Sequence, residues 1–223
     1  MYKTEMHCHS APVSRCAHAG AEVIVERYTA AGYSTVVLTN HISRWNFENY
    51  DFASWNDMMD FYLKDYHDLQ KAAEGKLNIL LGAEIQLELN HNDYLIYGLN
   101  EEKLRALGDV LPLGFRQFTD RVHEQGCLIY QAHPMRFGMT LMNPDWDGHY
   151  DGIEGHNAHD HHDSHNDLAQ LWAAKLGLPM SSGSDFHDPE GHIGGGILTE
   201  RPITTMAELM NTLKSGAYEL IRE

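Results

Sequence analysis

Strand-like and helix-like runs alternate along almost the whole sequence. One expected strand is the run at 35–39, which is rich in β-branched residues. The other expected strands are 3–8, 77–81, 94–97, 127–131, 151–154, 180–184 and 218–221. The expected helices are 21–31, 54–74, 115–125, 164–176 and 205–214. At the start of the fourth, Ser164 and Asp167 resemble a capping box. Such alternation favours a parallel sheet with helices outside it. About seven units without an evident linker predict an α/β barrel, or a near relative, as a single domain over 1–223.

Histidine is the unusual part of the composition. The 223 residues include 16 histidines, as many as all lysines and arginines together. Neutral imidazole is the commonest metal ligand in proteins, so this composition favours metal chemistry. The 32 acidic residues leave a formal charge of −16, which repels phosphate backbones and anionic lipid. We therefore expect binding to neither a long nucleic acid duplex nor a membrane.

The bulk features also predict a cytoplasmic location. No apolar run approaches the roughly 20 residues of a membrane span, and the first residues lack the pattern of a secretion signal. Cys8, Cys16 and Cys127 form no C-x-x-C pair, which argues against a disulfide framework or a cysteine zinc ribbon. We expect each to be a small, buried apolar residue. The oligomeric state is not predictable from these features.

Polar residues of metal-binding type collect at the carboxyl ends of the expected strands. His7 and His9 end the first strand two residues apart, so their side chains face the same way. The others lie at or just past a strand end: His41, Glu84, His133, Asp185 and His187. That face is where α/β barrels assemble their sites. The convergence therefore favours one shared metal site over isolated core or surface histidines.

The motifs that contain these residues resemble those of the polymerase and histidinol phosphatase (PHP) family of metal-dependent phosphoesterases. They are His7-Cys8-His9-Ser10, Thr39-Asn40-His41, Gly82-Ala83-Glu84, Ala132-His133-Pro134 and Gly183-Ser184-Asp185-Phe186-His187. Together they cover nearly the whole chain, and the set is specific where one tripeptide would not be. The resemblance implies a distorted (β/α)7 TIM-like barrel. It also implies two or three divalent transition-metal ions (zinc, manganese or iron) at the C-terminal face.

The resemblance further implies which residues hold the ions. The ligands of the first ion would be His7, His9, Glu84 and Asp185. Glu84 would bridge to a second ion that also takes His133. Members with a third ion have another histidine where His18 lies, and the ligands of that ion here would be His18, His41 and His187.

Two positions depart from the family pattern. The second motif usually reads Thr-Asp-His, and Asn40 replaces the acid, so His41 is expected to be held differently. The family also often has a second-metal histidine near the strand after Glu84. Here His91 and Asp93 both lie slightly early. Either could fill that position, or the second ion could lack one protein ligand.

The charge of the expected site explains how an acidic protein could bind phosphate. Six neutral histidines with Glu84 and Asp185 carry about −2, so two divalent ions bring the cluster to about +2 and three to about +4. Arg136 and Arg44 each follow a motif histidine by three residues. Because guanidinium binds phosphate oxygens bidentately, Arg136 is the preferred clamp and Arg44 the second. The alternative for each is a surface ion pair.

A histidine-rich tract follows the strand at 151–154. Glu154, His156 and Asn157 could border the site, with His156 as a candidate general acid. The remainder, 159–165, is expected to be a solvated loop. Neither a phosphate-binding G-x-G-x-x-G nor a G-x-S-x-G elbow occurs in the sequence.

The sequence thus predicts a metal-dependent phosphoesterase that acts on a small phosphomonoester by attack of a metal-bridging hydroxide, with Glu84 and Asp185 at its centre. Two alternatives stay open. One is an amidohydrolase-type hydrolase of C–N or C–O bonds, whose barrel lysine is not recognisable here. The other is a non-catalytic PHP-like module that binds a partner. Loops such as 43–54 and 135–149, expected to set selectivity, carry no recognisable motif.

Overall fold

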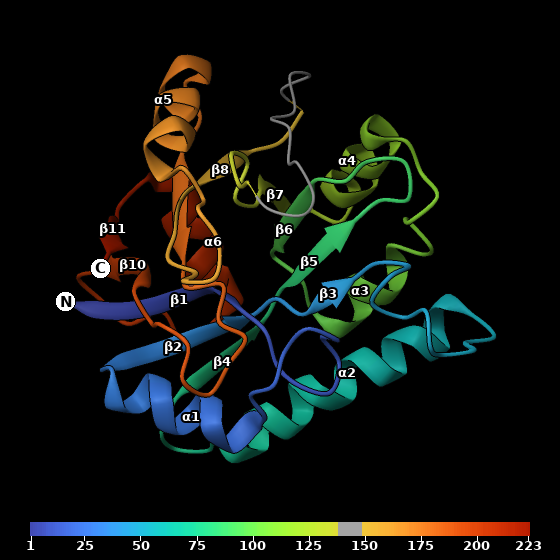
Figure 1. Cartoon of the computed structure of the whole chain (residues 1–223), viewed down its shortest axis with the longest axis horizontal. Helices are drawn as coiled ribbons and strands as arrows, with labels where there is room; N and C mark the ends of the chain where they lie inside the picture. The colour runs from blue at the N-terminus through green and yellow to red at the C-terminus, as the bar shows by residue number, and fades with distance from the viewer. Residues whose placement is uncertain (138–148) are drawn as a thin grey trace.

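The computed structural model describes residues 1–137 and 149–223, so most of the 135–149 loop lies outside the described residues. The chain is an α/β protein with two mixed sheets (Figure 1). The strands are β1 (Tyr2–Cys8), β2 (Tyr33–Leu38), β3 (His41–Ile42), β4 (Asn78–Leu81), β5 (Ala83–Gln86), β6 (Asp93–Tyr97), β7 (Leu128–Gln131), β8 (Gly152–Asn157), β9 (Met180–Gly183), β10 (Gly195–Thr199) and β11 (Glu219–Arg222). The helices are α1 (Ala21–Ala30), α2 (Trp55–Ala72), α3 (Glu101–Ala106), α4 (Phe115–Glu124), α5 (Asn166–Leu176) and α6 (Met206–Ser215).

The two sheets differ from the all-parallel arrangement that the alternation predicts. One sheet has the order β11-β10-β1-β2-β4 and the other β3-β5-β6-β7-β8-β9. Strand β6 runs antiparallel to both neighbours, and β10 runs antiparallel to β1. Only residues 87–92 connect β5 to β6, and a parallel crossover needs a dozen residues or more. The short connection therefore forces β6 to turn back.

A bend at Gly82 places two of the expected site residues side by side. Its amide donates to Leu38 O, and one residue later the chain continues as β5, where Glu84 pairs in register with His41. A Cβ at Gly82 would lie 2.9 Å from the Val37 side chain, so only glycine fits without a shift. The bend thus places Glu84 directly beside His41 on the neighbouring strand.

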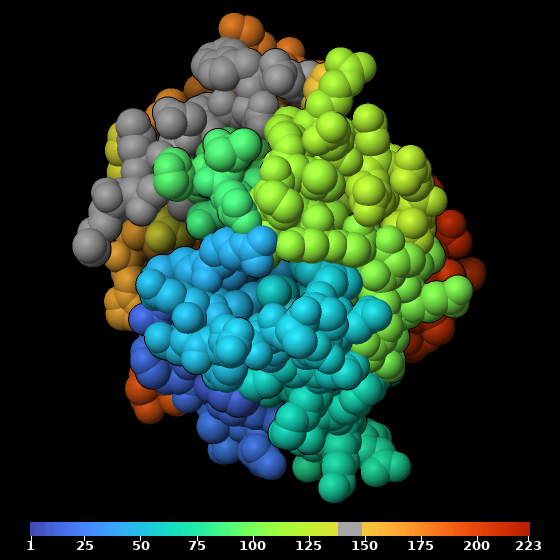
Figure 2. Space-filling model, turned by 90° about the vertical axis from the view of Figure 1, so that its right-hand side faces the viewer, coloured from blue at the N-terminus to red at the C-terminus, as the bar shows by residue number. Residues whose placement is uncertain are grey.

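Helices α1 and α2 pack against the β1-β2-β4 region (Figure 1). The turned view shows α2 and the loop before it beside the residues of α3 and α4 (Figure 2). Helix α2 begins where Ser54 accepts a hydrogen bond from the Asp57 amide, and it buries Met59 and Tyr62 completely. Each such burial stabilises the fold by about 1.5–3 kcal/mol. Among the described residues, we find no helix with the length and hydropathy needed to cross a membrane.

The start of α5 differs from the capping box expected at Ser164. The helix begins at Asn166 after His165, which adopts a left-handed φ of 44°. The Ser164 hydroxyl instead donates to Asn157 Oδ1, 3.1 Å away. A partner seven residues earlier in the chain therefore replaces the one expected within the helix. The sequence also did not indicate β10, because glycine-rich residues have low strand propensity.

Glycines at the end of β9 and the start of β10 allow the two strands to approach closely. A Cβ on Gly195 would lie 1.9 Å from the carbonyl carbon of Gly183. A parallel bridge from Cys8 to Phe186 lies nearby and connects the two sheets. The chain that follows Gly183 is therefore held against both β1 and β10.

Candidate metal centre

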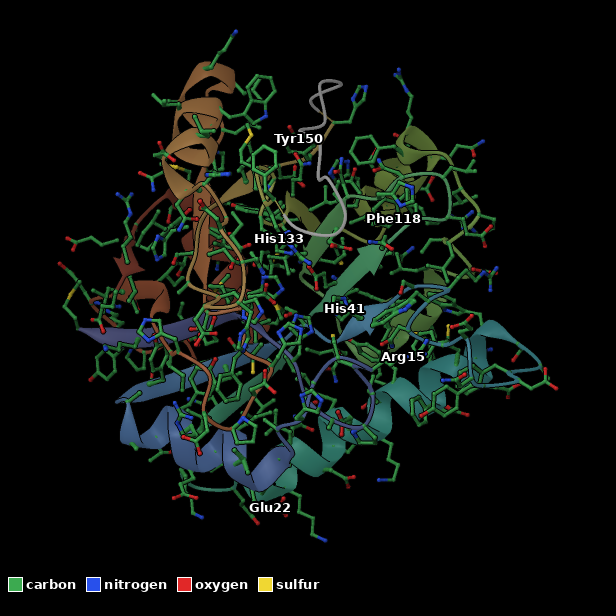
Figure 3. The ribbon with its side chains drawn as sticks, in the orientation of Figure 1. Arg15, Glu22, His41, Phe118, His133 and Tyr150 are labelled. Carbon is green, nitrogen blue, oxygen red and sulfur yellow. The ribbon has the colours of Figure 1, made fainter. Side chains whose placement is uncertain are left out.

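Seven of the residues predicted from the sequence to be metal ligands lie together in the interior. They are His7, His9, His41, Glu84, His133, Asp185 and His187. All are buried except His41, whose side chain is 18% exposed. They come from β1, β3, β5 and the segments directly after β1, β7 and β9. The labelled pair His41 and His133 lies near the centre of the molecule, whereas Glu22 lies on its outer surface (Figure 3).

The first group of ligand atoms has the spacing of a metal site. His7 Nε2 lies 3.3 Å from both Glu84 Oε2 and Asp185 Oδ1. His9 Nε2 lies 3.2 Å from the same two oxygens. Tetrahedral zinc with bonds of about 2.0–2.1 Å places its ligand atoms about 3.3 Å apart. Both Nε2 atoms and Glu84 Oε2 are buried without a hydrogen-bond partner in the described parts of the chain. An ion bonded to all four atoms would remove that cost.

The second group extends from the other oxygen of Glu84. Glu84 Oε1 lies 3.2 Å from His133 Nε2, and Asp93 Oδ2 lies 4.0 Å from the same nitrogen. Asp93 is buried, and this burial together with the charge of Glu84 raises the pKa of its carboxyl to about 6. His91 is exposed. The structure thus brings Asp93, and not His91, toward the second group.

The third group consists of His9, His41 and His187, whose ligand atoms all lie within 4.8 Å of one another. The ring of His9 stacks on the other two rings at 4.3 Å. His18 is not in this group. Its side chain is 70% exposed, and its Nδ1 lies 2.6 Å from Asp188 Oδ1. The backbone amide of His18 donates to His187 O, so the backbone approaches the group while the imidazole does not.

Opposite charges control the ionisation of the cluster. Burial opposes ionisation of Glu84, but the charges of His7 and His41 lower the pKa of its carboxyl well below the usual range. Burial likewise opposes protonation of His41, yet Glu84 raises the pKa of that imidazole well above 6.5. Asp185 has a pKa well below its usual range because His7 and His187 offset its burial. The positive charge of the neighbouring imidazoles thus stabilises the buried carboxylates of Glu84 and Asp185 in their anionic form.

Glu154 forms hydrogen bonds with two residues of the cluster, His7 and His133. Its Oε1 accepts a hydrogen bond at 2.9 Å from His7 Nδ1, which leaves Nε2 of that ring as the ligand atom. Its Oε2 accepts from the His133 amide at 2.9 Å and from Asn157 Nδ2 at 3.0 Å. Asn157 also donates to Asp185 Oδ2. The sequence indicated Glu154 and Asn157 only as border residues.

His156, the expected general acid, lies on the other face of the same strand. The pairing of β8 with β9 shifts register between Glu154 and His156, so Gly155 is an extra residue in the ladder. Glu154 and Asn157 therefore both face the cluster. His156 does not: apart from Glu154, the charged groups near it are Arg222 and His192. This placement gives no support to a role for His156 in proton transfer at the cluster.

Replacing Glu154 with glutamine should weaken metal binding without removing a ligand. Glutamine keeps the size of the side chain but loses the charge that orients His7 and makes it more basic. We expect a loss of about 10–100-fold in metal affinity. Competition with a coloured chelator would measure it, with Glu190→Gln on the surface as the control variant. Equal affinities in the two variants would show that Glu154 does not act on the ligands.

Asn40 stands where the family motif usually has an aspartate, and here it belongs to a buried network of polar side chains. Ser14 Oγ lies 3.2 Å from His9 Nδ1 and donates to Asn40 Oδ1 at 2.8 Å. Asn40 Nδ2 in turn donates to Asp65 Oδ2 at 3.1 Å. Ser14 Oγ also accepts from the His41 amide. Asp65 on α2 thus supplies the carboxylate, which acts on His9 and His41 through two neutral side chains.

Two residues of the cluster have an unusual backbone conformation. His133 has a φ of 24° and Asp185 a φ of 51°, values that cost about 1–3 kcal/mol when the residue is not glycine. The buried Glu5 fixes the backbone just before Asp185. Its carboxylate accepts hydrogen bonds from the Ser184 amide at 2.9 Å and from the Ser184 hydroxyl at 2.5 Å. Burial raises the pKa of Glu5 to about 7. The surrounding contacts thus maintain strain at the ligands.

The two arginines differ in their surroundings. Arg44 is 52% exposed and pairs with Glu88 at 2.5 Å and Asp109 at 3.1 Å, which is the surface ion pair considered as its alternative. Arg136 is half-buried, and its Nε has no hydrogen-bond partner in the described chain. Its charge acts on Asp93 and His133. The structure therefore places Arg136, and not Arg44, beside the second group.

The histidine-rich loop is not entirely in solvent. His159 and His162 are half-buried, and their rings lie 5.1 Å from His187 and 6.0 Å from His133 respectively. Burial lowers the pKa of His159 to about 4 and that of His162 to about 3. His159 also forms a possible ligand group with Asp185 and His187. Sequence spacing alone could not indicate which histidines of the loop turn inward.

Comparison with known proteins adds a family match. Residues 163–218 match the family model described as PHP-associated. This segment contains β9, β10, α5 and α6, and therefore Asp185 and His187. None of the curated proteins gives a significant match to the chain.

Solved structures with similar folds include three bacterial and archaeal proteins. A two-domain protein containing a predicted PHP-like metal-dependent phosphoesterase, from Bacteroides vulgatus, has a TM-score of 0.70 at 18% identity over 100% of this chain and 65% of that one. The lesion-specific endonuclease PfuEndoQ from Pyrococcus furiosus has a TM-score of 0.67 at 16% identity, over 98% and 57%. PsfC from Pseudomonas syringae has a TM-score of 0.73 at 15% identity, over 100% and 91%.

The chain thus spans less than two thirds of the length of the first two of these structures. At such low identities the likeness shows the fold alone. At that level, it confirms the resemblance indicated by the sequence motifs.

Proposed function

This chain has the fold of PHP-like metal-dependent phosphoesterases and a PHP-associated segment, and from these we propose that it hydrolyses phosphate esters, with small phosphomonoesters as its substrates. The observation that carries the proposal is the position of Glu84. Its two carboxylate oxygens face two different groups of buried ligand atoms, 3.2–3.3 Å away. A carboxylate shared in this way is suited to a pair of metal ions.

The two sheets are consistent with the distorted (β/α)7 TIM-like barrel that the motifs imply. Counting β2 with β3 and β4 with β5 as bent strands gives seven positions from β1 to β9. The ligands lie within the last residues of these strands or just after them, at the carboxyl ends where barrel enzymes have their sites. We propose this barrel as the framework of the centre.

Divalent ions at these positions would polarise the phosphoryl oxygens and lower the pKa of a bound water. The first ion would be held by His7, His9, Glu84 and Asp185, and the second by Glu84, His133 and Asp93. Glu154 and Ser14 fix the histidine tautomers by accepting hydrogen bonds from Nδ1. Arg136, beside the second group, would neutralise charge on the phosphate. His159 and His162, which are neutral at pH 7, would donate hydrogen bonds to the substrate.

Metal analysis and substrate screening together test this function. We expect the purified chain to hold two or three transition-metal ions and to hydrolyse phosphomonoesters faster than dinucleotides, amides or carboxylic esters. Cleavage of only amides or carboxylic esters would instead favour an amidohydrolase-type enzyme. A folded chain that holds its metals but hydrolyses nothing would favour a partner-binding module. A folded chain that binds no transition metal would contradict the centre itself.

Arg136 and Arg44 offer a matched pair of variants for substrate binding. Because Arg136 lies beside the second group, Arg136→Ala should raise KM for a phosphomonoester roughly 10–100-fold, the value of a charged hydrogen bond or two. Arg44→Ala removes the same charge from a surface ion pair and should leave KM unchanged. Steady-state kinetics on both variants would measure this. Equal KM values for the two would remove Arg136 from the substrate site.

A further inference from the structure

Cys16 is a thiol beside the third group of imidazoles that the proposed function does not use. Its side chain hydrogen-bonds with the side chains of both His41 and His187. It is half-buried and forms no disulfide. The other two cysteines are buried elsewhere: Cys8 packs in a hydrophobic cluster with Phe186, and Cys127 packs in the largest one. Cys16 was expected to be a buried apolar residue, and its neighbours are instead possible metal ligands.

The imidazole group beside Cys16 has the character of an ion site. The ligand atoms of His9, His41 and His187 lie within 4.8 Å of one another. His9 Nε2 belongs to the first group, so the imidazoles that remain for another ion are those of His41 and His187. Carboxylates border both of them: Glu84 Oε2 lies 3.0 Å from His41 Nδ1, and Asp185 Oδ1 lies 3.5 Å from His187 Nδ1. A metal ion bound to the two imidazoles would place positive charge beside these carboxylates.

The loop that carries Cys16 is fixed on both sides. The amide of Arg15 donates to Asn46 Oδ1 at 2.8 Å, and the amide of Ala17 donates to Ser14 O at 3.0 Å. Further along, the amides of His18 and Ala19 both donate to His187 O. These bonds hold Cys16 toward the imidazoles and leave the His18 side chain with Asp188. In this loop the thiol therefore occupies the place for which a histidine ligand was expected.

We propose that Cys16 is a thiolate ligand of a third divalent transition-metal ion, bound together with His41 and His187. This inference rests on the proposed metal centre and goes beyond it. When the ion binds, the thiol S–H bond breaks, the proton passes to solvent and a sulfur–metal bond forms, with no oxidation or reduction. Thiolate with imidazole is a donor set typical of zinc, and it favours softer ions over magnesium or manganese.

Cobalt(II) reports directly on such a ligand. The full chain would be stripped with a chelator and titrated with cobalt chloride while the ultraviolet and visible spectra are recorded. We expect a thiolate-to-cobalt charge-transfer band and about three bound ions. Cys16→Ser should lose the band and one ion while the other two remain bound. Cys127→Ser, which removes a thiol from the hydrophobic core, should keep both the band and the third ion.

The outcomes separate this inference from the proposed function. Cobalt binding without a charge-transfer band, or an undiminished band in Cys16→Ser, would overturn the assignment of Cys16 and leave the two-metal centre standing. A folded chain that binds no cobalt would overturn both.

Alkylation of the unaltered protein provides a second measurement if the variant fails to fold. Iodoacetamide should modify Cys16 at least about tenfold more slowly when zinc is present than when it has been removed, because a bound thiolate is a poor nucleophile. Peptide mass spectrometry would follow each cysteine, with Cys127 as the internal control. Equal rates at Cys16 with and without zinc would overturn the inference.

Discussion

Glu84→Gln is expected to abolish hydrolysis. The variant keeps the size of the side chain but replaces one bridging oxygen by an amide nitrogen that donates hydrogen bonds and does not bind cations. Both groups of ligand atoms meet at this residue, so one substitution acts on two ions. We expect kcat/KM to fall by about 10³-fold or more, and the metal content to fall by at least one ion per chain.

Kinetics and elemental analysis of the same preparation would measure both effects, and circular dichroism would show whether the variant is folded. Glu88→Gln is the matched control, since Glu88 lies four residues further along and pairs with Arg44 on the surface. It should keep full activity and all its metal. A folded Glu84→Gln variant with unchanged metal content and activity would show that Glu84 does not bridge ions.

Metal removal should destabilise the protein, and the effect should grow with pH. An ion present at about 1,000 times its dissociation constant stabilises the folded state by about 4 kcal/mol, or roughly 10 °C in Tm for a chain of this length. In the metal-free protein, protons on the histidines replace the ions in part. The balance between protons and ions then sets the pH dependence.

The direction follows from the pKa shifts. Burial opposes protonation of His7, but Asp185 and Glu154 raise its pKa well above 6.5, as Glu84 does for His41. Their contribution to stability is fully present below pH 6.5 and is lost as the pH rises through the raised values. The lowered pKa of Glu84 gives a contribution that is present above about pH 4.5 and is lost only in acid. The metal-free protein therefore loses stability as the pH rises above neutrality.

Thermal unfolding with and without zinc would test this at pH 6 and pH 8. We expect a larger gain in Tm at pH 8, where the ion has no histidine protons to displace and meets carboxylates that lack counter-charge. Calcium serves as the control ion and should give little gain at either pH. A gain in Tm that is equal at both pH values, or larger at pH 6, would contradict the proposed coupling.

The sequence could predict the histidines at the strand ends because the signal there is local. Two residues in a strand that are separated by one must face the same way, so His7 and His9 had to lie together. The expected helices and most expected strands are also present, since each depends on the periodicity of its own residues. The positions of Glu84, His133 and Asp185 at other strand ends then indicated the same shared site, and the family resemblance implied which ion each of them would hold.

What the sequence could not predict depends on backbone detail. The extra residue at Gly155 separates Glu154 from His156, although two residues in a regular strand would share a face. The direction of β6 follows from the length of one loop. The outward direction of the His18 side chain depends on the hydrogen bond from its own amide to His187 O, which is 169 residues away in the sequence. Such long-range contacts leave no pattern in a single sequence.

The strained backbones of His133 and Asp185 have a consequence for which ions the centre accepts. Because Glu5, Glu154 and neighbouring amides hold these residues in place, the ligand atoms cannot move apart freely. Calcium takes about six to eight oxygen ligands, whereas the first group offers two imidazole nitrogens and two carboxylate oxygens, with nitrogen–oxygen distances of 3.2–3.3 Å. The fold therefore favours ions that accept few ligands in a fixed arrangement, and in the described part of the chain it does not supply the additional oxygens that calcium would need from a movable shell.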